Sequence, residues 1–361
     1  MNKEKRTLEF PRRETRQVVV GGVRIGGGAP IIVQSMTDTD TRDIDATAAQ
    51  IRKLEGHGCE IVRVAVPDRE AAAALSAIKQ QSRIPLIADI HFDYRLALES
   101  LAADVDGLRI NPGNIGSRER VRQVVSAAAE RNIPIRIGVN SGSLEKDLLK
   151  QHNGATAEAM VESALRHIRI LEDLDFRAIK VSLKASDIPR TLRAYRLLAE
   201  EVDYPFHAGI TEAGSLLSGS VKSAAGLTLL LAEGLVDTLR VSLTAPPENE
   251  VRVAYRILSS LGIRQRGPDI ISCPVCGRCE VDISRIADEV EQKLALLTAP
   301  IRVAVMGCMV NGPGEAKEAD IGVACGRGSA VIFKQGRILR KLKEEEIVDV
   351  LVSEAFLLAG E

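Results

Sequence analysis

The chain has 361 residues, with 48 Lys and Arg against 49 Asp and Glu and a formal net charge of −1. This balance excludes a global attraction to nucleic acid or anionic lipid, and the 3 % aromatic content without Trp argues against base-stacking surfaces. No apolar run reaches the roughly 20 residues of a membrane span, and the charged N-terminus lacks a signal-peptide core. We therefore expect a cytoplasmic protein with reduced thiols.

The first two thirds of the chain predict an α/β fold. QVVVGGVRIGGG (17–28) is typical of a β-hairpin with a Gly-Gly turn, which would plug the floor of a barrel. From residue 30, short β-branched runs alternate with amphipathic helical stretches; the runs lie at 30–36, 60–66, 85–90, 107–111, 134–140, 178–184, 205–210 and 238–243. Eight such units predict a (β/α)8 TIM barrel, with a doubly wound open sheet as the runner-up.

The remainder predicts a second, smaller domain. We divide the chain into residues 1–262, a substrate-binding barrel with its hairpin, and residues 263–361, which hold five of the six cysteines. The segment 263–269 is interpreted as a linker with a hinge at Gly267–Pro268. The rest predicts an α+β domain, whose expected elements are a helix over 282–297, a strand over 301–307, an NGPG turn at 311–314, short strands and a helix over 341–358.

Several predicted barrel strands carry a cation in mid-run, where parallel strands are normally apolar. These cations are Arg63, Arg109, Arg136, Lys180 or Lys184, and Arg240. A buried cation without a partner costs several kcal/mol, and the same strands offer few acids beyond Glu60 and Asp89. We therefore expect a bound anion, a small phosphate or diphosphate ester, because the planar arginine fork suits phosphate.

Polar residues gather where the predicted strands end, which is the edge of a TIM barrel that carries the active site. They are Asp89, His91, Asn111, Asn114, Asn140, Lys184, His207 and Glu212.

The cysteines Cys273-x2-Cys276-x2-Cys279 have the thiolate spacing of a zinc or an iron–sulfur site. The candidates for a further ligand are Cys308, Cys325 and Glu315. Zinc cannot change oxidation state, so an iron–sulfur cluster is favoured. The rival readings are a pterin-type or methyl-transfer barrel with a structural zinc tail, and a zinc-ribbon nucleic-acid binder.

Together these motifs resemble the bacterial 4-hydroxy-3-methylbut-2-enyl diphosphate synthase family from about residue 12 to beyond 320. The motifs are SCPVCGR, GCMVNGPGE, VQSMTDT, LIADIHFDYR, LRINPGNIG, IRIGVNSGSLEKDL, KVSLKASD, HAGITEAG and DTLRVSL. The resemblance implies two-electron reductive opening and dehydration of 2-C-methyl-D-erythritol 2,4-cyclodiphosphate to (E)-4-hydroxy-3-methylbut-2-enyl diphosphate, a step of the non-mevalonate isoprenoid pathway. It implies reduced flavodoxin or ferredoxin as the electron donor.

The resemblance also implies site residues. A 4Fe-4S cluster would be held by Cys273, Cys276 and Cys308, with Glu315 as fourth ligand; Cys279 departs from the family pattern. Glu212 would handle a proton. The substrate-binding residues would be Arg63, Asp89, Arg109, Arg136, Asn140, Lys184, His207 and Ser242.

The path of the chain adds a prediction about assembly. The last barrel helix returns the chain to the floor, and a linker of about six residues spans at most roughly 20 Å. A cluster domain attached there would not easily reach the mouth of its own barrel. We therefore expect a head-to-tail homodimer, which the resemblance also implies.

Overall fold

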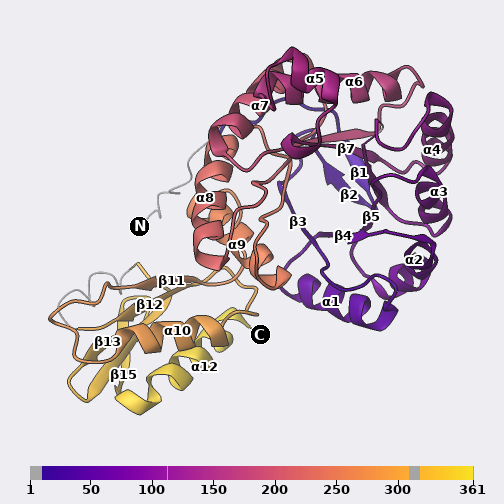
Figure 1. Cartoon of the computed structure of the whole chain (residues 1–361). Helices are drawn as coiled ribbons and strands as arrows, with labels where there is room; N and C mark the ends of the chain where they lie inside the picture. The colour runs from indigo at the N-terminus through magenta and orange to yellow at the C-terminus, as the bar shows by residue number, and fades with distance from the viewer. Residues whose placement is uncertain (1–9, 112, 309–317, 361) are drawn as a thin grey trace. The chain divides into compact units, whose positions relative to one another are not determined.

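The computed structural model describes residues 10–111, 113–308 and 318–360, and the chain divides into two compact units, Met1–Ile263 and Arg264–Glu361 (Figure 1). In the described ranges no helix is both long and apolar enough to cross a membrane.

The first unit is a barrel of eight parallel strands in the order β8-β7-β6-β5-β4-β3-β10-β9. A parallel bridge between Val181 and Phe206 joins the two ends of that order. The strands are β3 (Ile32–Met36), β4 (Ile61–Ala65), β5 (Leu86–Asp89), β6 (Gly107–Ile110), β7 (Ile135–Asn140), β8 (Ile179–Lys184), β9 (His207–Ala208) and β10 (Thr238–Leu239). Each lies within one of the eight predicted runs, and the predicted TIM barrel is confirmed.

Helices surround the strands (Figure 1). They are α1 (Ile44–Gly56), α2 (Arg69–Gln81), α3 (Tyr94–Ala102), α4 (Arg118–Glu130), α5 (Lys146–Gln151), α6 (Ala157–Glu172), α7 (Ile188–Glu201), α8 (Leu216–Ala232) and α9 (Pro247–Ser260), with a short 3-10 turn at Ser141–Ser143. Several begin at an aspartate cap: Asp43, Asp68 and Asp187 each accept a hydrogen bond from a first-turn amide. The βα loops before these three helices therefore end at fixed positions.

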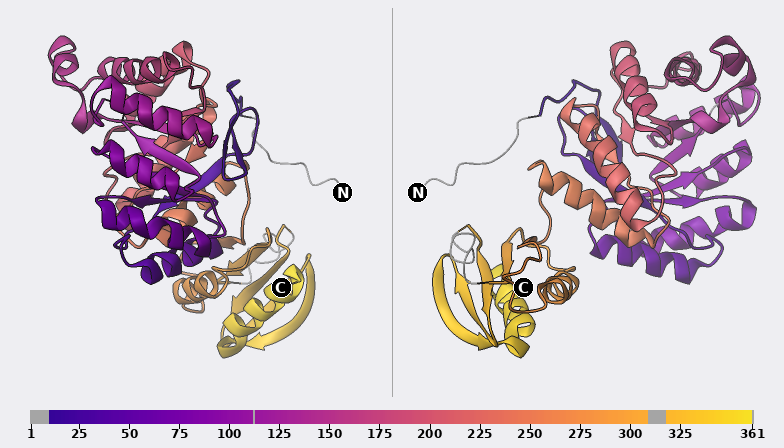
Figure 2. Two further views of the ribbon diagram at one scale, coloured as in Figure 1. Left: turned by 90° about the vertical axis from the view of Figure 1, so that its right-hand side faces the viewer. Right: turned by 60° about the vertical axis from the view of Figure 1, so that its left-hand side comes forward.

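The predicted hairpin is confirmed. β1 (Val18–Val20) and β2 (Val23–Ile25) pair antiparallel through Gly21 and Gly22, both at positive φ. The hairpin lies inside the ring of strands in Figure 1 and at one end of it in Figure 2. Its buried side chains pack against the first inward residues of three strands; this cluster is Val20, Ile25, Ile32, Ile61 and Ile87. The apolar plug closes the barrel floor, so the polar interior opens only at the other end.

The second unit is a five-stranded sheet with two helices, which confirms the α+β prediction. Its order is β11-β12-β13-β14-β15, with the first three strands parallel and the rest antiparallel. α10 and α12 pack on one face through Ile286, Val290 and Leu351. The elements are β11 (Asp269–Ser272), α10 (Ile283–Lys293), β12 (Arg302–Met306), β13 (Ile321–Gly326), β14 (Ser329–Lys334), β15 (Arg337–Lys343), a 3-10 turn (Glu344–Glu346) and α12 (Ile347–Ala359).

Two details of the second unit differ from the expectation. The helix expected from residue 341 begins at Ile347, because Lys341–Lys343 pair with β14. The strand β11 was not expected. Gly267 and Pro268 are buried and the Gly267 amide donates to the Thr298 carbonyl. The predicted hinge at this dipeptide stays a prediction. The predicted NGPG turn lies outside the described residues.

Candidate active site and metal-binding thiols

Cations line the inside of the barrel at neighbouring positions. In the parallel register Arg109 pairs with Arg136, and Arg136 pairs with Lys180, so the three side chains share the inward face of β6, β7 and β8. All three are buried, with Arg136 and Lys180 each 2 % exposed. Lys184 follows Lys180 on the same face, level with Asn140 of β7. Both lysines that the sequence left as alternatives therefore face inward.

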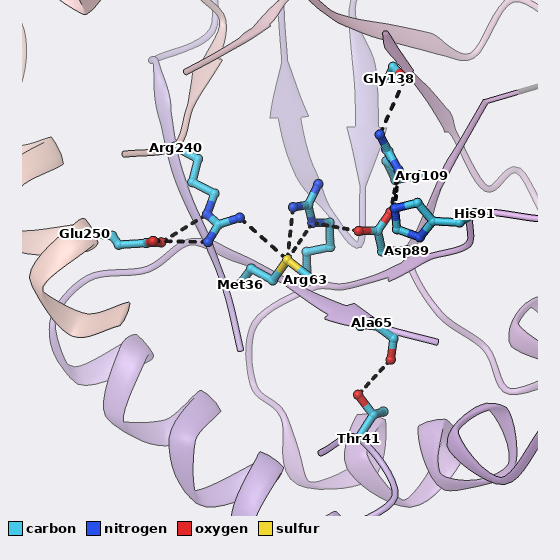
Figure 3. Close-up of polar contacts among 10 residues, drawn as sticks. All are labelled: Met36, Thr41, Arg63, Ala65, Asp89, His91, Arg109, Gly138, Arg240 and Glu250. Carbon is cyan, nitrogen blue, oxygen red and sulfur yellow. Dashed lines mark hydrogen bonds and ion pairs between the residues drawn. The ribbon is translucent and has the colours of Figure 1, made fainter. Parts of the chain in front are cut away.

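Asp89, at the end of β5, forms ion pairs with two barrel cations, Arg63 and Arg109 (Figure 3). Its carboxylate lies 3.6 Å from Arg63 Nε and 3.2 Å from Arg109 Nη1. Burial would raise the pKa of Asp89, but the charges of Arg63 and Arg109 outweigh burial and lower that pKa to about 2. Gly138 makes room for Arg109, because a Cβ there would lie 2.5 Å from Arg109 Nε. Asp89 thus holds both guanidinium groups in place and stays ionised.

Arg240 has a partner that the sequence did not reveal. Glu250 of α9 accepts hydrogen bonds from Arg240 Nε at 3.0 Å and Nη2 at 3.1 Å, and another from Ser35 Oγ at 2.9 Å (Figure 3). The expectation that the barrel cations lack acids counted only the strands, and for Arg240 it was wrong. The signal in the sequence was a glutamate inside the apolar stripe of α9, beside Val251.

Met36 lies between Arg63 and Arg240 (Figure 3). Its sulfur accepts hydrogen bonds from Arg63 Nε at 3.2 Å and Nη2 at 3.0 Å, and from Arg240 Nη1 at 3.5 Å. A thioether is a weak and uncharged acceptor. Met36 therefore orients the two guanidinium groups without neutralising either.

The deeper polar groups have no protein partner in the part of the chain that the structure describes. They are all three guanidinium nitrogens of Arg136, Lys180 Nζ, His207 Nε2 and both side-chain amide atoms of Gln34. A guanidinium does not give up its proton, so burial of Arg136 must be offset by an anion or by water. This is the strongest structural sign that the barrel takes a negatively charged ligand.

His207 is neutral in this setting. Burial, followed by the charges of Arg136 and Lys184, lowers its pKa well below the ordinary value. Its Nδ1 lies 2.8 Å from Thr238 Oγ1, and Nε2 has no described partner. His91, which follows β5, lies beside the same cations: its Nε2 accepts a hydrogen bond from Arg109 Nη1 at 3.0 Å, and burial lowers its pKa.

The remaining predicted residues sit at the mouth in loops or strand ends. Asn140 and Lys184 end β7 and β8, and Ser242 follows β10. Glu212 lies in the loop between β9 and α8 with an exposed side chain and a φ of +52°, an uncommon conformation for a residue other than glycine. Among the described residues no ion pair reaches Glu212, so the mouth cations do not hold it in place.

In the second unit, thiols lie at the carboxyl ends of two neighbouring strands of the sheet. Cys273 follows β11 and Cys308 follows β12, and these strands are parallel neighbours whose carboxyl ends meet. The Gly307 amide donates to Cys273 Sγ at 3.1 Å. The Cys279 amide donates to the Cys276 carbonyl at 3.0 Å, which turns the 273–279 loop back on itself. All of these cysteines are free thiols.

This donor set fits an iron–sulfur cluster. Soft thiolates are its normal ligands, and an amide hydrogen bond to sulfur, as at Cys273, is a usual feature around such clusters. Within the described ranges no three potential ligands already stand together as a closed metal site. Glu315, the predicted fourth ligand, lies outside the described residues.

The other cysteines differ in their surroundings. Cys325 of β13 packs in the core of the second unit, and burial raises its pKa to about 12. Cys279 Sγ lies 2.9 Å from the position that a Cβ on Gly307 would occupy, so Cys279 lies beside the other thiols. Cys325 is thus a core residue, whereas Cys279 belongs to the thiol cluster.

Comparison with known proteins identifies the family. The GcpE TIM-barrel domain model matches residues 15–255, and the GcpE protein C-terminal domain model matches residues 269–356. A relative from Geobacter sulfurreducens, "4-hydroxy-3-methylbut-2-en-1-yl diphosphate synthase (flavodoxin)", is 60% identical over 343 residues, which are 95% of this chain and 97% of the relative. A relative of the same name from Thermodesulfovibrio yellowstonii is also 60% identical, over 95% of this chain and 98% of its own.

Among solved structures, the Yersinia pestis dihydropteroate synthase covers 68% of this chain and 98% of its own at 13% identity and a TM-score of 0.49. At that level the likeness is no argument for a pterin-type function. The two family models and the full-length relatives agree with the motifs of the sequence. The chain therefore belongs to the GcpE family, the 4-hydroxy-3-methylbut-2-en-1-yl diphosphate synthases.

Proposed function

We propose that this chain catalyses the reductive ring opening and dehydration of 2-C-methyl-D-erythritol 2,4-cyclodiphosphate to (E)-4-hydroxy-3-methylbut-2-enyl diphosphate. The reaction consumes two electrons and one proton and releases one water. The substrate carries two negative charges as a cyclic diester, and the opened diphosphate carries three. The observation that supports this most strongly is Arg136, which is buried inside the barrel without a carboxylate partner among the described residues.

The barrel residues would bind the diphosphate and hold it as the leaving group. Arg63 and Arg109 are fixed in position by Asp89, while Arg136 and Lys184 lack a described carboxylate partner and would take the phosphate oxygens. Neutral His207 can donate or accept a hydrogen bond through Nε2, according to its tautomer. Asn140 and Ser242 at the mouth would add neutral hydrogen bonds.

The cofactor in this proposal is a 4Fe-4S cluster held by Cys273, Cys276 and Cys308, with Glu315 as fourth ligand. When bound, the cluster would supply the two electrons and a Lewis-acidic iron for the oxygen that leaves as water. The electron donor would be reduced flavodoxin, for which the relatives are named, or ferredoxin. Such chemistry needs a reducing compartment, and the cytoplasm remains the predicted one.

Glu212 would deliver or accept the proton. It is the exposed carboxylate of the β9–α8 loop, and its left-handed backbone fixes where the side chain starts. A carboxylate at the mouth can exchange protons with solvent, which the buried groups cannot do directly.

The assembly would be a head-to-tail homodimer. The Tyr255 hydroxyl of α9 donates to the carbonyl of Gly58, just before β4, so the chain leaves the first unit at the amino ends of the strands. Lys184 ends β8 and Arg240 follows β10, so both lie at the opposite, carboxyl ends of the strands. A thiol site on a short connection from the floor would more readily serve the barrel of a second copy.

The test is anaerobic turnover of the cyclodiphosphate with reduced flavodoxin, followed by phosphorus NMR. We expect the two signals of the cyclic diphosphate to be replaced by those of a linear diphosphate. The Cys308→Ser variant should bind the substrate without converting it. Full-length, iron-loaded protein that binds but never opens the ring would contradict the proposal.

A further inference from the structure

One side of the barrel interior carries polar atoms that no protein group satisfies. Gln34, Arg136, Lys180 and His207 lie on β3, β7, β8 and β9, which are joined through β10 into one continuous stretch of wall. Each of these side chains is at most 2 % exposed. Buried polar groups normally have a partner, so this wall is built to meet a ligand or ordered water.

The charges in this interior do not balance. In the described part of the barrel, two carboxylates, Asp89 and Glu250, form ion pairs with members of a set of six basic side chains: Arg63, Arg109, Arg136, Lys180, Lys184 and Arg240. The excess is larger than the two charges of a cyclic diphosphate. Arginine keeps its proton at every physiological pH, whereas lysine readily loses its proton when buried. Among these six basic side chains, the charge can therefore adjust at a lysine but not at an arginine.

Lys180 is the lysine that is placed to do so. It lies early in β8, level with Arg136, whereas Lys184 ends the strand and is partly exposed. The charged or titratable groups that face Lys180 are Arg136 from β7, Arg63 from β4, His207 from β9 and Asp237 from the residue before β10. Tyr195 of α7 lies behind the same wall and donates its hydroxyl hydrogen to the His207 carbonyl.

Asp237 does not supply the missing negative charge. Its carboxylate lies 3.1 Å from Arg12 Nη2 and accepts a hydrogen bond from the Phe206 amide at 2.8 Å, so its charge is already shared. Burial and the charge of Arg136 lower the pKa of Lys180 well below its ordinary value, and Asp237 opposes this shift without reversing it.

We propose that Lys180 is a further anion-binding residue of the site: it is uncharged in the free protein and takes up one proton from solvent when a diphosphate enters the barrel. The step is simple protonation of the amine to an ammonium. A bound anion beside Arg136 offsets the repulsion that, together with burial, keeps Lys180 neutral. In the proposed function, on which the identity of the ligand rests, the new ammonium would also match the third charge that the diphosphate gains when the ring opens.

The test is calorimetric titration of inorganic pyrophosphate into the full-length protein, in two buffers of different ionisation enthalpy at the same pH. The buffer dependence of the heat gives the protons taken up per ligand. Comparison with Lys180→Met removes the contribution of pyrophosphate itself, because that is common to both proteins. We expect Lys180→Met to take up about one proton fewer and to bind about 10-fold or more weakly, since hydrogen bonds to charged groups are strong.

Two controls separate this role from a general effect. Lys222→Met removes a partly exposed lysine of α8 and should leave both proton uptake and affinity unchanged. Lys180→Met should raise the melting temperature of the free protein, because it removes a buried amine without a partner, so weaker binding cannot reflect misfolding.

Equal proton uptake by the wild type and Lys180→Met would overturn the proposal, and so would unchanged affinity. Pyrophosphate binding requires neither electrons nor iron. A protein that shows the proton uptake but never opens the cyclodiphosphate would defeat the proposed function and leave the role of Lys180 intact.

Discussion

At the scale of single residues, the electrostatics of the barrel interior depend on which cations have a carboxylate partner. Asp89 serves Arg63 and Arg109, and Glu250 serves Arg240, whereas Arg136 has no described partner. The carboxylates therefore hold Arg63, Arg109 and Arg240 in position in the folded protein. The burial of Arg136 is instead offset by a bound anion or by water.

Replacing Arg136 should therefore affect catalysis far more than folding. We expect Arg136→Met to lower kcat/KM by about 100-fold or more, because it removes a charged donor that can bind phosphate in two places. Thermal unfolding should be unchanged or shifted upward, because a desolvated charge is lost. The matched control is Arg122→Met, which removes an exposed arginine paired with Glu119; near-normal turnover by Arg136→Met would contradict the assignment.

Replacing Asp89, in contrast, should lower the stability of the fold. Asp89→Asn leaves two buried guanidinium groups without their anion and should lower the free energy of unfolding by about 3 kcal/mol or more at neutral pH. The pKa of Asp89 is lowered in the folded state to about 2, so its stabilisation is complete above the unfolded pKa of about 4 and is lost as the pH falls toward 2. Urea unfolding of both proteins from pH 7 to pH 2 measures this.

The difference in free energy of unfolding between the wild type and Asp89→Asn should become smaller as the pH falls toward 2. A gap that does not change with pH would mean that the ionised carboxylate is not what stabilises the barrel. Asp173→Asn, at an exposed pair with Arg118, should change little at any pH.

At the scale of elements, two parallel strands bring the thiols together. β11 and β12 end side by side, and Gly307 lies between Cys273, which its amide contacts, and Cys279, which fills the space beside its Cα. A side chain at Gly307 would meet Cys279 Sγ at 2.9 Å and Ile283 at 3.4 Å. A side chain at Gly307 would therefore displace the Cys279 thiol, and it is space rather than backbone conformation that favours glycine there.

We expect Gly307→Ala to reduce the iron bound per chain at least by half while the protein still folds, because it pushes the thiols apart. Gly277→Ala in the same loop is the matched control, because nothing lies within 4 Å of its Cβ position. Iron should be assayed after anaerobic purification, with circular dichroism to check the fold. Equal iron in both variants would show that this edge of the sheet does not hold the metal.

Most strands and helices could be predicted from the sequence, and the exceptions have physical causes. The eight β-branched runs identified the barrel strands, because buried parallel strands have few other compositions. Glu250 was missed because it reaches Ser35 across 215 residues of sequence, and only the closed barrel brings α9 to β3. Lys341–Lys343 favoured a helix by composition, but pairing with β14 made them a strand.

At the scale of the whole molecule, the anion site and the thiols lie in different units of one chain. The sequence predicts candidate residues for both sites, because each candidate lies in a recognisable motif. That the two sites meet in a head-to-tail dimer stays a prediction. The proposed reaction needs both sites at one substrate.

A head-to-tail dimer makes a prediction about mixed subunits. Glu212→Ala removes the proposed proton-handling residue of the barrel site, and Cys308→Ser removes a proposed ligand of the thiol site. Each homodimer should therefore be inactive. When the two variants are unfolded together and refolded anaerobically, hybrid dimers should contain one intact pair of sites and recover about a quarter of wild-type activity, as expected for random pairing. Absence of any recovered activity would contradict an active site shared between subunits.

The most direct measurement is the iron and acid-labile sulfide bound per chain in protein purified without oxygen, taken together with its turnover of the cyclodiphosphate. The account predicts a brown protein with about four irons and four sulfides in each active chain. A colourless protein without either, turning over at the full rate, would contradict it.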